Sequence, residues 1–170
     1  TRSDAIVDAG VCVVGGHPDI RNLGNQTQFV MTPRPLFFDL DHTLWDFETN
    51  SRLALRLGHE TMGLAGLGVD SVEAWIASYE KANDWCWAEF RAGRMDKATL
   101  RAERFRLAFK GLGVPVEARV CERLGDHYIE TSPMQTSLME GTLEVLDVLK
   151  DRGHRMVILL SLIHISEPTR

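Results

Sequence analysis

Two short, mainly apolar runs flank a long stretch with helical periodicity. The first run is Leu36–Leu40, which ends with the acid Asp39 and Leu40, and the second is 155–159, which is apolar after its first residue. Runs of this length without alternation of apolar and polar residues are typical of parallel strands covered on both faces. We therefore predict two buried parallel strands, one near each end of this part of the chain.

Five segments between the two runs have apolar residues at helical spacing. Their predicted spans are 50–62, 70–93, 96–111, 115–129 and 142–151. Short polar residues that accept hydrogen bonds from free N–H groups mark the first three starts, namely Asn50 or Ser51, Asp70 or Ser71, and Asp96. The sequence therefore predicts helices over these spans.

The order of the elements indicates the fold class. Pro115 is expected in the first turn of the fourth helix, and the polar stretch 131–136 is expected to be a linker. A strand, a crossover helix and a second strand make the parallel α/β unit, whereas four helices are too many for a simple loop. We predict an α/β core with an inserted helical lobe.

Composition narrows the class of protein further. The chain has 170 residues, a net charge of −5 and 44% hydrophobic residues, which are values of an ordinary soluble globular protein. The mildly acidic balance argues against a nucleic-acid or membrane partner, and no apolar run is long enough to span a bilayer. The three cysteines, Cys12, Cys86 and Cys121, form no CxxC pair, so we expect buried thiols in a reducing cytoplasm.

Both ends of the chain differ from its middle. Residues 1–30 precede the first methionine, Met31, and are expected to be a non-native upstream segment. Residues 160–170, LSLIHISEPTR, resemble the translation of a transposase-type sequencing adapter, so we expect an artefactual tail. The native stretch is then expected to be 31–159 and to be truncated at its C-terminal end.

Asp39 and Asp41 lie at the carboxyl end of the first predicted strand, where open parallel sheets bind ligands. Two carboxylates at this spacing repel each other, and Mg²⁺, which prefers oxygen ligands, would relieve the repulsion. Such a pair suits phosphoryl transfer, with Asp39 as nucleophile and Asp41 as general acid and base. On spacing alone, an equally good interpretation is that the two acids cap the next turn.

The segment LFFDLDHTLWDF, residues 36–47, resembles the first motif of the haloacid dehalogenase (HAD) superfamily, an apolar strand followed by DxDxT. The resemblance implies a Rossmann-like parallel sheet core with a helical cap, and Mg²⁺ as cofactor. It implies that Asp39 is the nucleophile and a metal ligand. Asp41 would be the acid/base and bind the metal through its carbonyl, and Thr43 would assist substrate binding. His42 stands at the variable position and has no role by this resemblance.

The resemblance extends over 31–159 and points to one subgroup. Segments 83–94 and 99–105 and the continuation LWDFETNS look like the bacterial pyrimidine 5′-nucleotidases, and 139–146 is similar to the family's stretch before the crossover helix. The implied domains are a core of 31–47 and 132–159 and a cap of 48–131. The implied substrate is a small phosphorylated molecule, most closely a nucleoside 5′-monophosphate. The second, third and fourth motifs are missing, so the chain as given is expected to be inactive.

Two groups of side chains in the helical lobe allow two interpretations each. An aromatic stripe is expected to be core rather than a platform for a nucleobase: Trp75, Tyr79, Trp85, Trp87 and Phe90. A set of arginines is expected on a solvated helix face rather than against phosphate or sugar: Arg91, Arg94, Arg101 and Arg104.

Several functions compete with a nucleotidase. A dehalogenase needs the nucleophile but not the second acid, so Asp41 argues against that branch. A sugar-phosphate or phosphoglycolate phosphatase and a phosphomutase would both keep the two acids and stay open. A non-catalytic fragment or binding module is the alternative that is not an enzyme.

Overall fold

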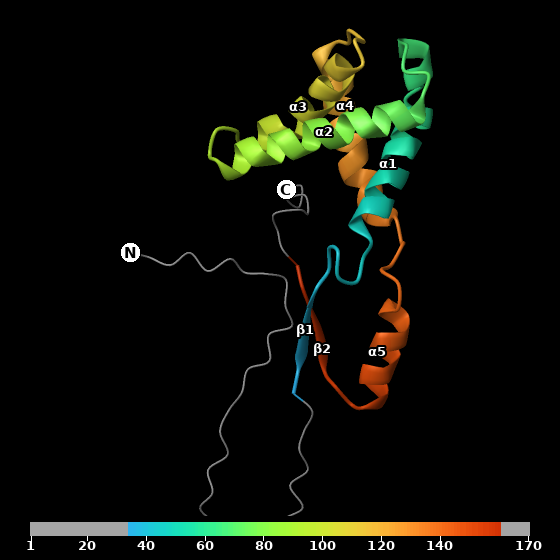
Figure 1. Ribbon diagram of the computed structural model, residues 1–170, viewed down its shortest axis with the longest axis vertical. Coiled ribbons are helices and arrows are strands. Elements are labelled where there is room, and N and C mark those ends of the chain that lie inside the picture. Colours follow the sequence, from blue (N-terminus) through green and yellow to red (C-terminus); the bar gives the residue numbers. More distant parts are fainter. Residues whose placement is uncertain (1–33, 161–170) are drawn as a thin grey trace, which may run out of the picture. The chain divides into compact units, whose positions relative to one another are not determined.

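The computed structural model describes residues 34–160, which form two compact units. One, called here the strand unit, comprises residues 34–46 and 138–160, and the other, the helical unit, is Phe47–Ser137 (Figure 1). The expectations for residues 1–30, for Cys12 and for the tail beyond Leu160 lie outside the described residues. The protein is a mixed α/β protein, as predicted.

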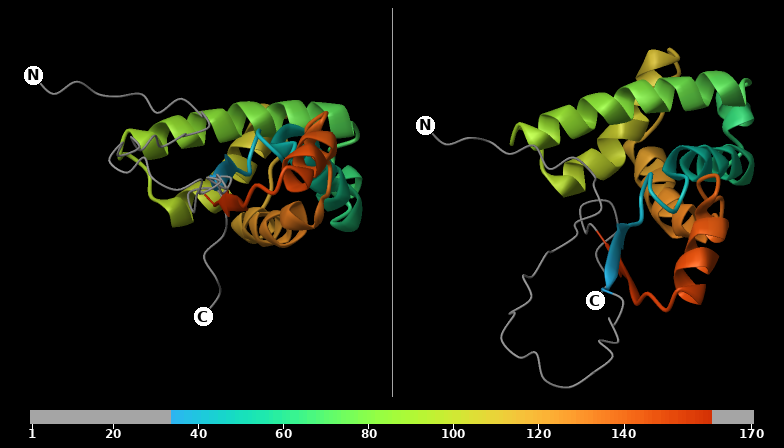
Figure 2. Two further views of the ribbon diagram at one scale, coloured as in Figure 1. Left: turned by 90° about the horizontal axis from the view of Figure 1, so that it is seen from below. Right: turned by 60° about the horizontal axis from the view of Figure 1, so that its bottom comes forward.

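The strand unit is a strand–helix–strand crossover. Strand β1 (Leu36–Asp39) pairs in parallel with β2 (Met156–Leu159), in a register that places Asp39 opposite Leu159. Helix α5 (Thr142–Asp151) connects them and lies beside the two strands (Figures 1 and 2). The parallel pair and its crossover helix confirm the topology expected from the two apolar runs.

The prediction that both strands are covered on both faces is wrong for the described residues. Phe38 is buried, but Phe37 is 38% exposed, and both Ile158 and Leu159 are 53% exposed. The reason is geometric, because within the described residues this unit supplies two strands and one helix. A single helix covers one face of a sheet at most.

The helical unit contains four α-helices: α1 (Phe47–Thr61), α2 (Val72–Arg91), α3 (Lys97–Gly111) and α4 (Ala118–Thr131). Two short 3-10 helices, η1 (Leu64–Leu67) and η2 (Ser132–Met134), follow α1 and α4. Helix α3 runs alongside α2 (Figure 2). Between them, the rings of Trp75 and Phe109 pack at a tilt of 47°, with ring centroids 4.9 Å apart. Of the helices in the described part of the chain, none is long and apolar enough to cross a membrane.

Two of the predicted helix caps are confirmed. The Ser71 hydroxyl accepts a hydrogen bond from the N–H of Ala74 at 3.1 Å, and Asp96 Oδ1 accepts one from the N–H of Thr99 at 2.6 Å. Gly93, with a left-handed φ of 70°, follows Ala92, the C-cap of α2. These bonds satisfy N–H groups that lack a partner inside the helix.

Three predicted boundaries are wrong. Helix α1 begins at Phe47, three residues before the expected cap. Helix α4 begins at Ala118, so Pro115 precedes it instead of standing in its first turn. Its lead-in is extended at Glu117, and Val114 and Val116 pack against the hydrophobic core. The expected linker 131–136 is partly helical, because η2 occupies its middle.

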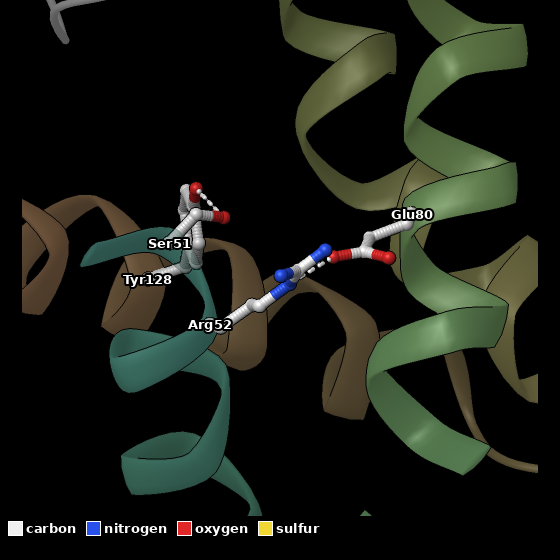
Figure 3. A network of polar contacts seen from close by, with 4 residues as sticks. All are labelled: Ser51, Arg52, Glu80 and Tyr128. Atoms are coloured by element: carbon white, nitrogen blue, oxygen red, sulfur yellow. Dashed lines mark hydrogen bonds and ion pairs between the residues drawn. The ribbon is translucent and has the colours of Figure 1, made fainter. Parts of the chain in front are cut away.

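Asn50 and Ser51 are interior residues of α1 with distant partners. The Asn50 amide donates to the carbonyl of Ser137 at 2.7 Å and accepts from its N–H at 2.9 Å. The Ser51 hydroxyl lies 2.8 Å from that of Tyr128, while the neighbouring Arg52 pairs with Glu80 (Figure 3). Asn50 and Ser51 are buried with these partners, which explains why they lie inside the helix and not at its terminus.

The interpretation of the aromatic stripe as core is confirmed for Trp75 and Tyr79, which are buried, whereas Trp85 is 49% exposed. The interpretation of the arginines is wrong for Arg104, which is only 7% exposed. The prediction of buried thiols is confirmed for Cys86 and Cys121.

Candidate active site

The loop that follows β1, residues 40–45, turns back on itself around one carbonyl group. The Leu40 carbonyl accepts hydrogen bonds from the N–H groups of Leu44 at 3.0 Å and Trp45 at 2.9 Å, with Thr43 at 3.4 Å. The Trp45 carbonyl accepts from the N–H of His42 at 3.0 Å. Asp39 and Asp41 flank Leu40, so the turn fixes the backbone from which both carboxylates extend.

His42 is the one residue other than glycine with positive φ in the described part of the chain, at φ 59°. Left-handed backbone is sterically unfavourable for residues with a Cβ atom, and histidine enters it more readily than β-branched residues. His42 is exposed and has no assigned chemistry. Its contribution is therefore the reversal of the backbone between Asp41 and Thr43.

The second half of the loop is attached to the segment before α5. Leu44 is buried, and its carbonyl accepts hydrogen bonds from the N–H of Met139 at 3.0 Å and from Thr142 Oγ1 at 3.3 Å. Gly141, with φ 78°, is the N-cap of α5, and the hydroxyl of the buried Thr142, the first residue of the helix, bonds back to the loop. The sequence identifies 139–146 as a family-like stretch, but it does not predict this anchor.

The structure places the predicted site residues on one short segment. Asp39 ends β1 and is half-buried, Asp41 is half-buried in the loop, and Thr43 is exposed. Asp41 also forms an isolated parallel bridge with Trp45. Their roles as nucleophile, acid/base and substrate contact remain predictions.

The oxygen atoms of Asp39 and Asp41 are suitable ligands for Mg²⁺, but they are too few to fill its coordination shell. Carboxylate oxygens are ligands that Mg²⁺ accepts, and it commonly takes one or two of them with water and a substrate phosphate completing the shell. Among residues 34–160, no group of three or more His, Cys, Asp or Glu side chains could hold a metal ion. The Asp39 carboxylate and the Asp41 main-chain carbonyl therefore fit as two ligands of such a shell, and not as a complete protein cage.

The fold and the acidic loop agree with a comparison against known families. The model of the haloacid dehalogenase-like hydrolases matches residues 36–161, most of the chain. The chain belongs to this family of hydrolases.

Individual relatives are more distant. Over 131 residues the chain is 24% identical to YfnB of Bacillus subtilis (strain 168), which is named as a HAD-hydrolase; the match covers 77% of this chain and 52% of YfnB. Over 119 residues it is 28% identical to the pyrimidine 5′-nucleotidase PynA of Streptococcus pneumoniae (strain ATCC BAA-255 / R6), covering 70% of this chain and 47% of PynA. The chain thus spans about half the length of the curated relatives it matches.

A solved structure supports the fold. The crystal structure of magnesium-bound YfnB superimposes with a TM-score of 0.62 at 23% sequence identity, covering 75% of this chain and 52% of that chain. The likeness shows that the matched part of the chain shares the fold of that structure, with its Rossmann-like core.

Proposed function

We propose that the complete gene product containing residues 34–160 is a Mg²⁺-dependent phosphomonoester hydrolase that acts through an aspartyl-phosphate on a nucleoside 5′-monophosphate. The observation that carries the proposal is the placement of Asp39 and Asp41. They flank Leu40, whose carbonyl closes the turn at the carboxyl end of a parallel strand, which is where this class of sheet binds ligands.

The proposed first step is attack by a carboxylate oxygen of Asp39 on phosphorus. A P–O bond forms to Asp39 while the ester P–O bond breaks, and Asp41 donates its proton to the leaving alcohol oxygen. In the second step a water molecule attacks the same phosphorus, and Asp41 accepts the proton of that water. The acyl-phosphate P–O bond breaks, which releases inorganic phosphate and regenerates both carboxyl groups.

The backbone supports this division of roles. Asp39 is part of the strand, so its main chain is held by the ladder to β2. Asp41 lies beyond Leu40, on the side that the turn holds through the Leu44 anchor to α5. Mg²⁺, held by Asp39 and Asp41, would offset the negative charge of the phosphoryl group when bound. Exposed Thr43 is proposed to donate its hydroxyl to a phosphate oxygen.

The choice of a nucleotide rests on the similarity to PynA and on the resemblance of the helical unit to the nucleotidase cap. A sugar phosphate or phosphoglycolate is the alternative substrate for the same chemistry. We place the protein in the cytoplasm, because Cys86 and Cys121 are free thiols.

The experiment is an assay of phosphate release by the complete gene product from uridine 5′-monophosphate, a hexose phosphate and phosphoglycolate. We expect Mg²⁺-dependent release that is fastest with the nucleotide and is abolished by EDTA. Asp39→Asn should eliminate the release, and Asp41→Asn should lower kcat on the order of 10²–10⁴-fold, the usual contribution of a general acid.

Glu122→Gln is the matched control, because Glu122 is an exposed acid of α4 outside the motif segments. Its rates should equal those of the unmodified protein. Unchanged activity in Asp39→Asn would refute the mechanism, and a preference for phosphoglycolate would refute the substrate while leaving the mechanism intact.

A further inference from the structure

Asn50, in helix α1, has a buried side chain whose two polar atoms both bind the backbone of one distant residue. Its Nδ2 donates to the carbonyl of Ser137 at 2.7 Å, and its Oδ1 accepts from the N–H of Ser137 at 2.9 Å. Asn50 is 0% exposed. Because donor and acceptor are both used on the same residue, the amide fixes the direction of the chain at Ser137 as well as its position. This pair of bonds is called here the Asn50 clamp.

The clamp lies where the chain enters and leaves the helical unit. That unit runs from Phe47 to Ser137, so Asn50 stands near its first residue and Ser137 is its last. The clamp thereby brings together residues that are 87 positions apart in sequence. Since Leu138 is covalently joined to Ser137, the clamp also sets where the next segment of the chain begins.

The next segment, 138–139, pairs with the acidic loop inside the strand unit. Leu138 forms an isolated antiparallel bridge with Trp45. The N–H of Met139 donates to the carbonyl of Leu44 at 3.0 Å. Such backbone pairing fixes which residue lies opposite which, so a displaced Leu138 either moves its partner or breaks the pairing.

The part of the loop that Leu138 contacts is the part that holds Asp41. Trp45 forms a parallel bridge with Asp41, and the carbonyl of Trp45 accepts a hydrogen bond from the N–H of His42 at 3.0 Å. The backbone of Asp41 is therefore linked to the Asn50 clamp through two consecutive backbone pairings, first with Trp45 and then with Leu138.

We propose that Asn50 is a positioning residue for Asp41, because it fixes Ser137 and so sets the register of 138–139 against the acidic loop. The proposal rests on the proposed function for the role of Asp41 as acid and base. Proton transfer depends on hydrogen-bond distance, so a displaced general acid lowers kcat while the binding of substrate is retained. Asn50 acts through the backbone alone and needs no metal.

The first test follows amide hydrogen exchange by NMR in the 170-residue chain, without substrate or metal. In Asn50→Ala we expect the Met139 and His42 amides to exchange roughly tenfold faster, the equivalent of about one lost hydrogen bond. The loop is loosened and not released, because Thr142 keeps its own bond to the Leu44 carbonyl.

Ser51→Ala is the matched control. Ser51 is the next residue of α1, it is also buried, and it bonds to Tyr128 within the helical unit (Figure 3). This variant should speed exchange in the helical unit without the tenfold gain at Met139 and His42. Equal exchange of these two amides in the Asn50 and Ser51 variants would overturn the proposal.

A second measurement decides the question if Asn50→Ala fails to fold. Native-state exchange of the unmodified chain in low urea gives the opening free energy of each amide. The proposal predicts that the Ser137 and Met139 amides open together, with the same opening free energy and the same dependence on urea. Opening of the two amides in separate steps would overturn it.

Kinetics of the complete gene product separate positioning from stability. With uridine 5′-monophosphate, Asn50→Ala should lower kcat roughly tenfold and leave KM unchanged, while Ser51→Ala should change neither. A raised KM at unchanged kcat in Asn50→Ala would overturn the proposal. Absence of phosphate release by the unmodified protein would refute the proposed function, and hydrogen exchange would still decide whether Asn50 holds the acidic loop.

Discussion

Ser51 and Tyr128 form a buried hydroxyl pair whose contribution to stability can be isolated. Ser51 is 9% and Tyr128 8% exposed, and their oxygens are 2.8 Å apart although the residues are 77 positions apart in sequence. Ser51→Ala leaves the buried Tyr128 hydroxyl without this partner, and Tyr128→Phe does the same to Ser51. Each change should lower the free energy of unfolding by about 1–3 kcal/mol, the cost of an orphaned buried polar group.

The double variant should cost much less than the sum of the single variants. It removes both hydroxyls together, so neither is left unsatisfied, and the coupling between the two positions should be roughly 1–2 kcal/mol. Urea unfolding of the chain, followed by circular dichroism and by tryptophan fluorescence, measures each free energy of unfolding.

The neighbouring residue provides the control cycle (Figure 3). Arg52 pairs with Glu80 at 2.7 Å, but the two side chains are 51% and 42% exposed. An exposed pair contributes about 0.2–1 kcal/mol, and salt screens it, so the Arg52→Ala and Glu80→Ala cycle should give the smaller coupling and lose it in 1 M salt. The reasoning is refuted if Ser51 and Tyr128 show no coupling, or if the exposed pair shows the larger one.

Three further predictions concern the loop and a helix cap. His42→Gly should leave thermal stability unchanged or raised, whereas His42→Val should destabilise by roughly 1–2 kcal/mol because φ is positive; thermal denaturation distinguishes them. Thr142→Val should remove the hydrogen bond to the Leu44 carbonyl and lower the free energy of unfolding in urea by about 1 kcal/mol. It should also speed amide hydrogen exchange of Trp45, and unchanged exchange there would contradict the role of the anchor. The Thr99 N–H holds the pKa of Asp96 below its ordinary value of 3.8. Because the pKa of Asp96 is lower in the folded state, the cap stabilises the fold above pH 3.8, and this contribution is lost as the pH falls through the folded pKa. The difference in urea midpoint between the unmodified chain and Asp96→Ala should therefore vanish below that pKa. A difference that persists there would contradict the cap.

The elements that the sequence predicts well depend on contacts between near neighbours. Ser71 and Asp96 each cap an N–H three residues later, a spacing that is visible in the sequence. The strand–helix–strand crossover is also readable, because 36–38 and 156–159 are continuous apolar runs and the helix between them has its own period.

The predictions fail where the position of a residue depends on a partner that is distant in sequence. Asn50 and Ser51 are residue types that favour helix N-caps, but here they are buried in the helical unit, where they form hydrogen bonds with Ser137 and Tyr128. No local spacing contains that information, because the bonds join residues 87 and 77 positions apart. The Leu44 anchor to Thr142 joins residues 98 positions apart and was missed for the same reason.

Arg104 shows two sequence rules in conflict. It stands four residues after Leu100 and four before Ala108, both buried, so helical periodicity places it on the buried stripe of α3. The rule that arginine stays in solvent favoured the opposite position. Periodicity prevailed because aromatic rings stabilise the guanidinium in place of water.

The most direct test of the central claim is to find the phosphoryl group on the protein. The complete gene product is mixed with uridine 5′-monophosphate and Mg²⁺, quenched in acid within milliseconds and digested for mass spectrometry. The proposed mechanism predicts one added phosphoryl group on the peptide that contains Asp39, and its absence in Asp39→Asn. Phosphate release with Asp39 unmodified at every time, or the phosphoryl group on another residue, would contradict it.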